Sequence, residues 1–194
     1  YPKSIHISLD EYKEKIVLVV PKIQIVTEPG FTTVGKPIIF PNKVKIAGSR
    51  NIVETISSVE TISDTIMNSN SPISINLLLK SERGELLEYT PKTVSFKQSV
   101  QSISERIISE IPVKILNVKS DVQAFVSPQT VSLTVIGGSD FISNLKPENL
   151  IISVDFNDWN SKKQFYDLNV KTSEDVISWM DLSPQNVELV VTKR

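Results

Sequence analysis

Apolar and polar side chains alternate in three stretches of the chain, and each stretch begins at or just before a proline. Apolar residues fall on every second position there, which is the period of a β-strand with one buried face. Proline fits the start of such a strand because its missing N–H costs the sheet no hydrogen bond. The prolines are 89 and 93 residues apart. The sequence therefore predicts a repeated β module, with copies of the motif at Tyr1–Ile7, Thr90–Phe96 and Ser183–Leu189.

Two further apolar runs recur inside the repeat, at Ile16–Val26 and Ile107–Leu116. Each contains a proline with a lysine close behind it, and we predict that both are edge strands kinked at Pro21 and Pro112. The order of motifs thus agrees between copies as well as the period. We predict that residues 1–9 are the last strand of a preceding repeat, that residues 10–98 form one module, and that residues 99–194 form a second.

A glycine followed by serine predicts one short helix in each module. A strand that follows a proline runs into Gly48 in one copy and into Gly137-Gly138 in the other. Ser49 and Ser139 come next and are expected N-caps, because apolar residues follow them at helical spacing. The predicted fold class is mainly β, with tandem β modules that each carry a short helix. We also expect a turn at Arg83-Gly84 and a short, stiff junction at Gln98–Ser104.

The charge is almost balanced, with 21 basic and 22 acidic residues and a net charge of −1. This excludes the basic footprint of a protein that binds a nucleic-acid backbone. Cysteine is absent, so the chain has neither disulfides nor thiolate metal sites. No apolar run reaches the ~18 residues of a membrane span. Because residue 1 lies within a copy of the repeat and is not Met, we expect a piece of a longer protein.

Three groups of polar residues could carry chemistry, and each has a simpler interpretation. His6 is the only histidine and lies in a predicted strand, without the partners that a catalytic triad or a zinc site needs. Asp155, Asn157 and Asp158 are too few for a calcium loop and suit a turn after a strand. Gly137–Asp140 matches no phosphate-binding fingerprint, and its aspartate would repel an anion. We therefore assign no catalytic, cofactor-binding or metal-binding residue and predict that the chain is not an enzyme.

Four aromatic residues lie close together in the sequence: Trp159, Phe165, Tyr166 and Trp179. Exposed aromatic side chains stack on sugars or dock a partner. Phe165 and Tyr166 are adjacent in a predicted strand, so they point to opposite faces and at least one belongs to the core. Trp159 lies in a predicted loop and is the candidate contact residue.

The motif order resembles the YbbR-like repeat. The residues that carry the resemblance are Ile111-Pro112-Val113, Val154-Asp155-Phe156 and the closing strand from Pro184 to Leu189. The resemblance covers the tail of one repeat and two full repeats, although Thr61-Ile62-Ser63 stands where the first module should have an acidic residue. It implies extracytoplasmic, non-catalytic β modules behind a membrane helix. In CdaR-type members it implies regulation of a membrane-bound diadenylate cyclase, which makes cyclic di-AMP.

Two other function classes stay open: a structural or adhesive β-repeat of the cell envelope, and a carbohydrate-binding module using Trp159 and Trp179. For a partner protein, or another copy of this chain, we expect binding at the two edge strands and at the junction Gln98–Ser104. Lys22 and Lys114 are expected to protect those edges from indiscriminate pairing. The alternative is that the neighbouring module covers both edge strands and that they bind no partner.

Overall fold

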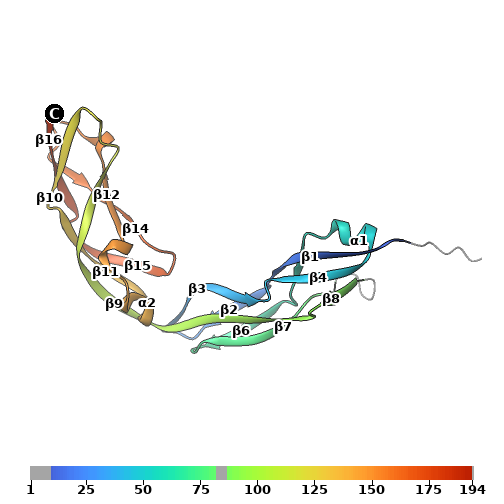
Figure 1. Ribbon diagram of the computed structural model, residues 1–194. Coiled ribbons are helices and arrows are strands. Elements are labelled where there is room, and N and C mark those ends of the chain that lie inside the picture. Colours follow the sequence, from blue (N-terminus) through green and yellow to red (C-terminus); the bar gives the residue numbers. More distant parts are fainter. Residues whose placement is uncertain (1–9, 82–86, 194) are drawn as a thin grey trace, which may run out of the picture. The chain divides into compact units, whose positions relative to one another are not determined.

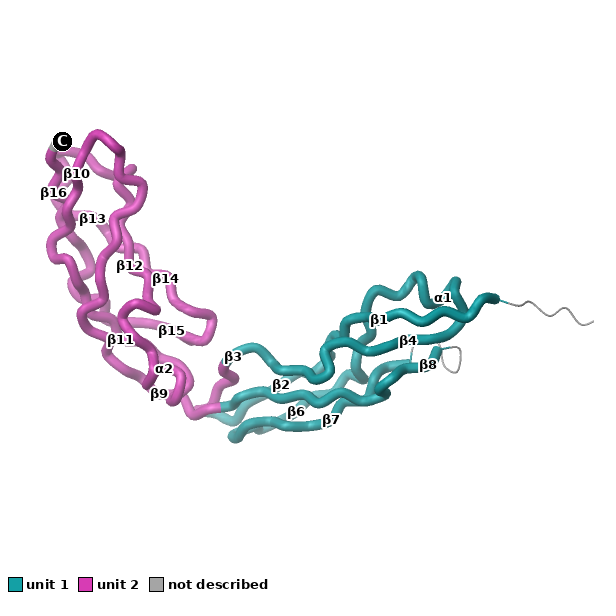
Figure 2. The backbone as a smooth tube through the Cα atoms, viewed as in Figure 1, with its two compact units in different colours: residues 1–29, 35–100 teal, residues 30–34, 101–194 magenta. Residues whose placement is uncertain are grey.

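The computed structural model describes residues 10–81 and 87–193. By its contacts the chain divides into two compact units (Figure 2). Unit 1 comprises residues 1–29 and 35–100, and unit 2 comprises residues 30–34 and 101–194. The short segment 30–34 thus packs with the second unit although it precedes most of the first. This division describes packing, and the repeat boundary between residues 98 and 99 stays a prediction. The strand predicted at residues 1–9, with His6, and the turn at Arg83-Gly84 lie outside the described residues.

Strands dominate both units (Figure 1), which confirms the mainly β class. Unit 1 contains β1 (Tyr12–Val20), β2 (Ile23–Thr27), most of β3 (Phe31–Phe40), β4 (Lys43–Ser49), α1 (Arg50–Thr55), β5 (Ser58–Glu60), β6 (Asp64–Ser69), β7 (Ile73–Leu78), β8 (Leu87–Thr90) and the first part of β9 (Thr93–Leu116). Unit 2 contains the rest of β9, β10 (Val122–Ser127), β11 (Thr130–Gly138), α2 (Ser139–Ser143), the 3-10 helix η2 (Pro147–Asn149), β12 (Ile151–Asp155), the 3-10 helix η3 (Phe156–Asp158), β13 (Phe165–Asp167), β14 (Asn169–Lys171), β15 (Val176–Ser183) and β16 (Asn186–Lys193).

The two units use the same strand pairings. In unit 1, β4 lies between β1 and β8 in antiparallel ladders, and β5 pairs parallel with the end of β1. In unit 2, β11 lies between β9 and β15, and β12 pairs parallel with the end of β9. The closing strands also correspond, because β7 pairs antiparallel with β9 as β13 does with β16. The repeat that the proline spacing predicts is therefore also present in the strand topology.

The alternating motif forms the core as its period requires. Val94 and Phe96 of β9 and Val187 of β16 are buried, and the residues between them face outward or lie at the surface. Pro91 and Pro184 each stand in the tight turn before these strands, as do Pro41 and Pro128 before β4 and β11, and all four follow a cis peptide bond. Each unit has its own apolar cluster, centred on Ile46 and Val53 in one and on Leu133 and Ile142 in the other.

Both short helices are held at their two ends by side chains of the strand that enters the unit or of the residues just before it. The Gln101 side-chain oxygen accepts hydrogen bonds from the backbone N–H groups of Asp140 (3.1 Å) and Phe141 (3.2 Å) at the start of α2. Arg106 Nη1 donates to carbonyls at the end of α2, those of Ile142 (2.9 Å), Ser143 (2.7 Å) and Leu145 (3.2 Å). These bonds satisfy terminal groups that the helix itself leaves unpaired.

Unit 1 repeats this arrangement with other residue types. The Asp10 carboxylate accepts from the N–H of Asn51 (3.4 Å) and from the Ser49 hydroxyl at the start of α1. Lys15 Nζ donates to the carbonyls of Ile56 (2.7 Å) and Glu54 (3.4 Å) at its end. Asp10 and Gln101, and likewise Lys15 and Arg106, are 91 residues apart. We call these four residues the helix clamps.

Ser49 is the N-cap residue of α1, as predicted, but Ser139 is not the cap of α2. The cap of α2 is Gly138, and Ser139 is the first residue of the helix. A Cβ at Gly138 would collide with the side chains of Val34 and Gln101, which explains why glycine occupies this position. The prediction was wrong by one residue. Gly138 is required by its packing against Val34, a distant segment of the chain that local sequence does not reveal.

Candidate interaction surfaces

The strands predicted as edges are paired on one side along most of their length, and a second neighbour joins each of them only at one end. β1 pairs with β4 over Tyr12–Leu18 and with β5 over Leu18–Val20. β9 pairs with β11 up to Pro112 and with β12 from Val113 onward. The parallel strand arrives from the crossover helix and covers only the end of its partner. Pro112 stands where the partner of β9 changes from β11 to β12, and Pro21 stands in the break between β1 and β2.

The lysines beside these prolines also serve within their own units. The Lys22 N–H donates to Thr61 Oγ1 at 2.9 Å, and its ammonium lies 3.0 Å from the Glu60 carboxylate. Lys114 lies opposite Ser153 in the ladder between β9 and β12. The protective role expected of the two lysines stays a prediction. The predicted junction at Gln98–Ser104 lies within the continuous strand β9.

One exposed apolar position recurs in both units. Ile16 of β1 is 68% exposed and Ile107 of β9 is 67% exposed, and the two are 91 residues apart, as the helix clamps are. Tyr12 and Ile103 have the same spacing and are also exposed. These side chains lie on the outer face of their sheets, because the alternate residues Val17 and Ile108 are buried. We call these four residues the recurring apolar row.

Asp155, Asn157 and Asp158 form the turn predicted for them. The Asp155 carboxylate accepts from both the Asn117 side chain (2.9 Å to each oxygen) and the Asn157 N–H (2.9 Å). These bonds, first of all the one from Asn117, hold the pKa of Asp155 below its ordinary value. The carboxylate is thus engaged in capping η3. Within residues 10–81 and 87–193 no group of three or more His, Asp or Glu side chains is placed to hold a metal ion.

The aromatic residues divide between core and surface. Tyr166 is buried, and its hydroxyl donates toward the carbonyls of Asn160 and Lys163 (both 2.9 Å) while accepting from the Asn160 N–H (3.1 Å). Phe165 is exposed, so the prediction that the pair is split between two faces is confirmed. Trp159 lies parallel to Phe156, with ring centroids 5.8 Å apart, and remains partly exposed. Trp179 is exposed on β15.

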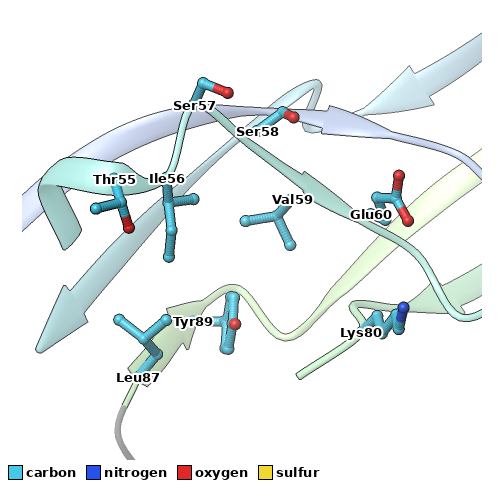
Figure 3. Close-up of a pocket in the computed structure, with 9 residues that line it drawn as sticks. All are labelled: Thr55, Ile56, Ser57, Ser58, Val59, Glu60, Lys80, Leu87 and Tyr89. Carbon is cyan, nitrogen blue, oxygen red and sulfur yellow. The ribbon is translucent and has the colours of Figure 1, made fainter. Parts of the chain in front are cut away.

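A cavity of about 370 Å³ opens in unit 1 between the α1–β5 loop and β8. Figure 3 shows Ile56 and Val59 facing Leu87 and Tyr89 across it, with the hydroxyls of neighbouring serines turned away. Unit 2 has a longer connection after its helix, which includes η2 and the buried Leu150. The buried Val59 stands 91 residues before Leu150 and takes the equivalent place in unit 1.

None of the helices in the described ranges has the length and hydropathy of a membrane-spanning segment. The clamped helices and repeated pairings define a class of protein, a two-unit β-repeat. No protein-family model and no curated protein sequence matches the chain.

Two solved structures are similar to the chain, and both are YbbR-like. The YbbR-like domain of a Listeria monocytogenes protein is 21% identical, over 47% of this chain and 95% of that one, with a TM-score of 0.38. A YbbR-like protein from Streptococcus pneumoniae TIGR4 is 14% identical, over 97% of this chain and 100% of that one, with a TM-score of 0.37. At these identities and scores we transfer no residue role, partner or activity from either.

Proposed function

We propose that this chain is a non-catalytic interaction module that acts outside the cytoplasm on a membrane-bound protein. The observation that carries the proposal is the recurring apolar row. Two units with different sequences keep an isoleucine two-thirds exposed at equivalent positions, Ile16 and Ile107. Exposing apolar surface to water is unfavourable, and apolar patches on soluble domains commonly mark contact sites.

The partner we propose is a diadenylate cyclase of the membrane, with the chain regulating the synthesis of cyclic di-AMP. This step comes from the resemblance of the sequence to YbbR-like repeats of the CdaR type. It includes anchoring to the membrane by a segment outside this sequence. The near-neutral charge of the chain suits a protein partner rather than a nucleic acid.

The test is cyclase output in membrane vesicles that contain a diadenylate cyclase from the genome encoding this chain. Adding the chain is expected to change the rate of cyclic di-AMP formation. The variant Ile16→Ser/Ile107→Ser is expected to lose most of that effect, whereas Ile177→Ser, at an exposed isoleucine outside the row, should retain it. A rate that is the same with and without the chain would refute the regulatory proposal.

A structural or adhesive repeat of the cell envelope is the second candidate. The observation in its favour is β9, one strand of 24 residues that contributes to both units. Tandem repeats in which each unit contacts only its neighbours need no catalytic or binding site to form an array, which suits a spacer. Under this alternative, the Ile16→Ser/Ile107→Ser variant would behave as the parent does in the cyclase assay. A glycan-binding role is tested by titrating the parent and Trp159→Ala with cell-wall oligosaccharides.

A further inference from the structure

The three-stranded sheet of unit 2 exposes aromatic side chains on its outer face. Its strand order is β10-β16-β13 (Figure 2). Phe125 of β10 lies directly opposite Val190 of β16, and the two are 46% and 50% exposed. Phe165 of β13 lies opposite Glu188, two residues before Val190, and is 52% exposed. Opposite and diagonal side chains on one face of a sheet are close enough to touch. We call Phe125, Phe165 and Val190 the outer aromatic face.

The fold itself does not require apolar residues at two of these three positions, because unit 1 places polar residues there. The buried pair Tyr166 and Val187 of unit 2 corresponds to the buried pair Leu77 and Val94 of unit 1. Counting from these pairs along the strands, Asn76 stands in the place of Phe165, and Lys97 stands in the place of Val190.

The two residues from unit 1 match the usual solvent-facing pattern of a sheet with one buried face. The apolar side chains of Phe165 and Val190 are therefore features of unit 2 alone, whereas the place of Phe125 is taken in unit 1 by another exposed apolar residue, Ile38. Core packing cannot explain the outer aromatic face, because the buried face of the same three strands already carries Val126, Tyr166 and Val187.

At the outward positions of the three strands the charges have one sign, and Lys163 in the loop before β13 lies over the Tyr166 ring. The outward positions of the three strands carry two ionisable groups, Asp167 and Glu188, and both are acidic. The remaining polar residues there are amides and hydroxyls, and the nearby Gln164 amide donates to the Glu188 carboxylate at 2.8 Å. An apolar centre with an acidic rim favours a partner whose apolar side chains are flanked by basic ones.

We propose that the outer aromatic face is a docking site for a protein segment whose apolar side chains are flanked by lysine or arginine. This proposal rests on the proposed function of the chain as an interaction module. It adds the chemistry of the partner that unit 2 would bind. Phenylalanine side chains supply the large, rigid contacts typical of interface centres. Glu188, between them in the sheet, would pair with a basic residue at the rim of the contact.

The experiment uses the full chain and two labelled synthetic peptides in fluorescence anisotropy. One peptide is an amphipathic helix with leucine on one face and lysine on the other, and its partner has glutamate at every lysine. The parent chain is expected to bind the lysine peptide and to bind the glutamate peptide much more weakly. The variant Phe165→Asn/Val190→Lys takes the residues of unit 1 and is expected to bind the lysine peptide roughly tenfold more weakly or worse.

Two controls separate a binding defect from a folding defect. The urea midpoint of tryptophan fluorescence reports unit 2, and Phe125→Gln provides a second variant on another strand of the same face. The variant Ile16→Ser/Ile107→Ser should bind the lysine peptide as the parent does, so a failure of the cyclase proposal is distinguishable from a failure of this one.

Several outcomes would overturn the docking site. One is equal binding of both peptides by the parent, or no binding of either. Another is a folded Phe165→Asn/Val190→Lys variant with parental affinity. A third is sedimentation showing that the parent dimerises through this face while the variant is a monomer, which would identify a second copy of the chain as the occupant.

Discussion

Arg106 is the clamp residue whose removal should have the largest effect on unit 2. Its guanidinium donates from one nitrogen to the carbonyls of Ile142, Ser143 and Leu145 at 2.7–3.2 Å. One NH₂ group has two hydrogens, so at most two of these bonds are strong at a time. In Arg106→Met the apolar stem is retained and the donors are lost, which isolates the hydrogen bonds from the packing of the side chain.

The expected loss is about 1.5 kcal/mol. Two bonds from a charged donor contribute roughly 1 kcal/mol each after exchange with water, and a cation at a helix C-terminus adds about 0.3–1 kcal/mol. Because Arg106 is exposed on its outer side, water replaces part of what is lost. With an m-value of about 2 kcal/mol per molar urea, the midpoint should fall by roughly 0.7 M.

Tryptophan fluorescence isolates this effect, since Trp159 and Trp179 are the only tryptophans and both belong to unit 2. Arg106→Lys is expected to lose about half as much, because Lys15 holds the helix of unit 1 through an ammonium. Lys15→Met changes the other unit and should leave the tryptophan transition where it is. If Arg106→Met unfolds within about 0.3 kcal/mol of the parent, the clamp contributes nothing to stability.

Three further predictions concern particular residues. Gly138→Ala should destabilise unit 2 by about 1–3 kcal/mol, because the added methyl collides with Val34 and Gln101, and urea unfolding followed by tryptophan fluorescence measures it. The bond from Ser49 lowers the pKa of Asp10 below its ordinary 3.8, so the stability from its carboxylate is present above that value and is lost as the pH falls through the lowered pKa. In Asp10→Asn, hydrogen exchange at the α1 amides should therefore depend less on acid pH than in the parent. The α2 amides, which Gln101 caps, should exchange alike in the variant and the parent. Tyr166→Phe removes the hydroxyl that ties the loop at Asn160, costs about 1–2 kcal/mol, and should increase quenching of Trp159 by acrylamide.

The strands with one buried face could be predicted from the sequence, because period-2 alternation and a preceding proline are local signals. Val94, Phe96 and Val187 are buried as that pattern requires. The extent of the open edges could not be predicted in the same way. Where the parallel strand joins β1 or β9 depends on pairing between distant segments, and an apolar run carries no signal for it.

The helix clamps carry no sequence signature. Gln101 and Arg106 precede α2 by more than thirty residues, and a glutamine in a strand is not a recognisable cap. The cap at Gly138 was missed for the same reason, since Val34 fixes it from another part of the chain. For the outer aromatic face, the sequence predicted only that Phe165 and Tyr166 point to opposite faces and that at least one of them belongs to the core. The partner strand that brings Phe125 to the same face required the register.

Comparison of the two units separates residues that the fold needs from residues that serve binding. Both units keep the helix clamps at equivalent positions, and the clamps hold the fold together. Both units also keep an exposed isoleucine, Ile16 or Ile107, which the fold does not need. What they change includes Phe165 and Val190, whose counterparts are polar. A partner that treats the two units alike would therefore contact the recurring apolar row, and one that distinguishes them would contact the outer aromatic face. Introducing Asn76→Phe/Lys97→Val into unit 1 tests this directly: the variant should gain a second binding site for the lysine peptide, seen as a doubled stoichiometry in calorimetry. A stoichiometry that stays at the parental value, in a folded variant, would mean that the apolar residues are insufficient without the acidic rim of unit 2.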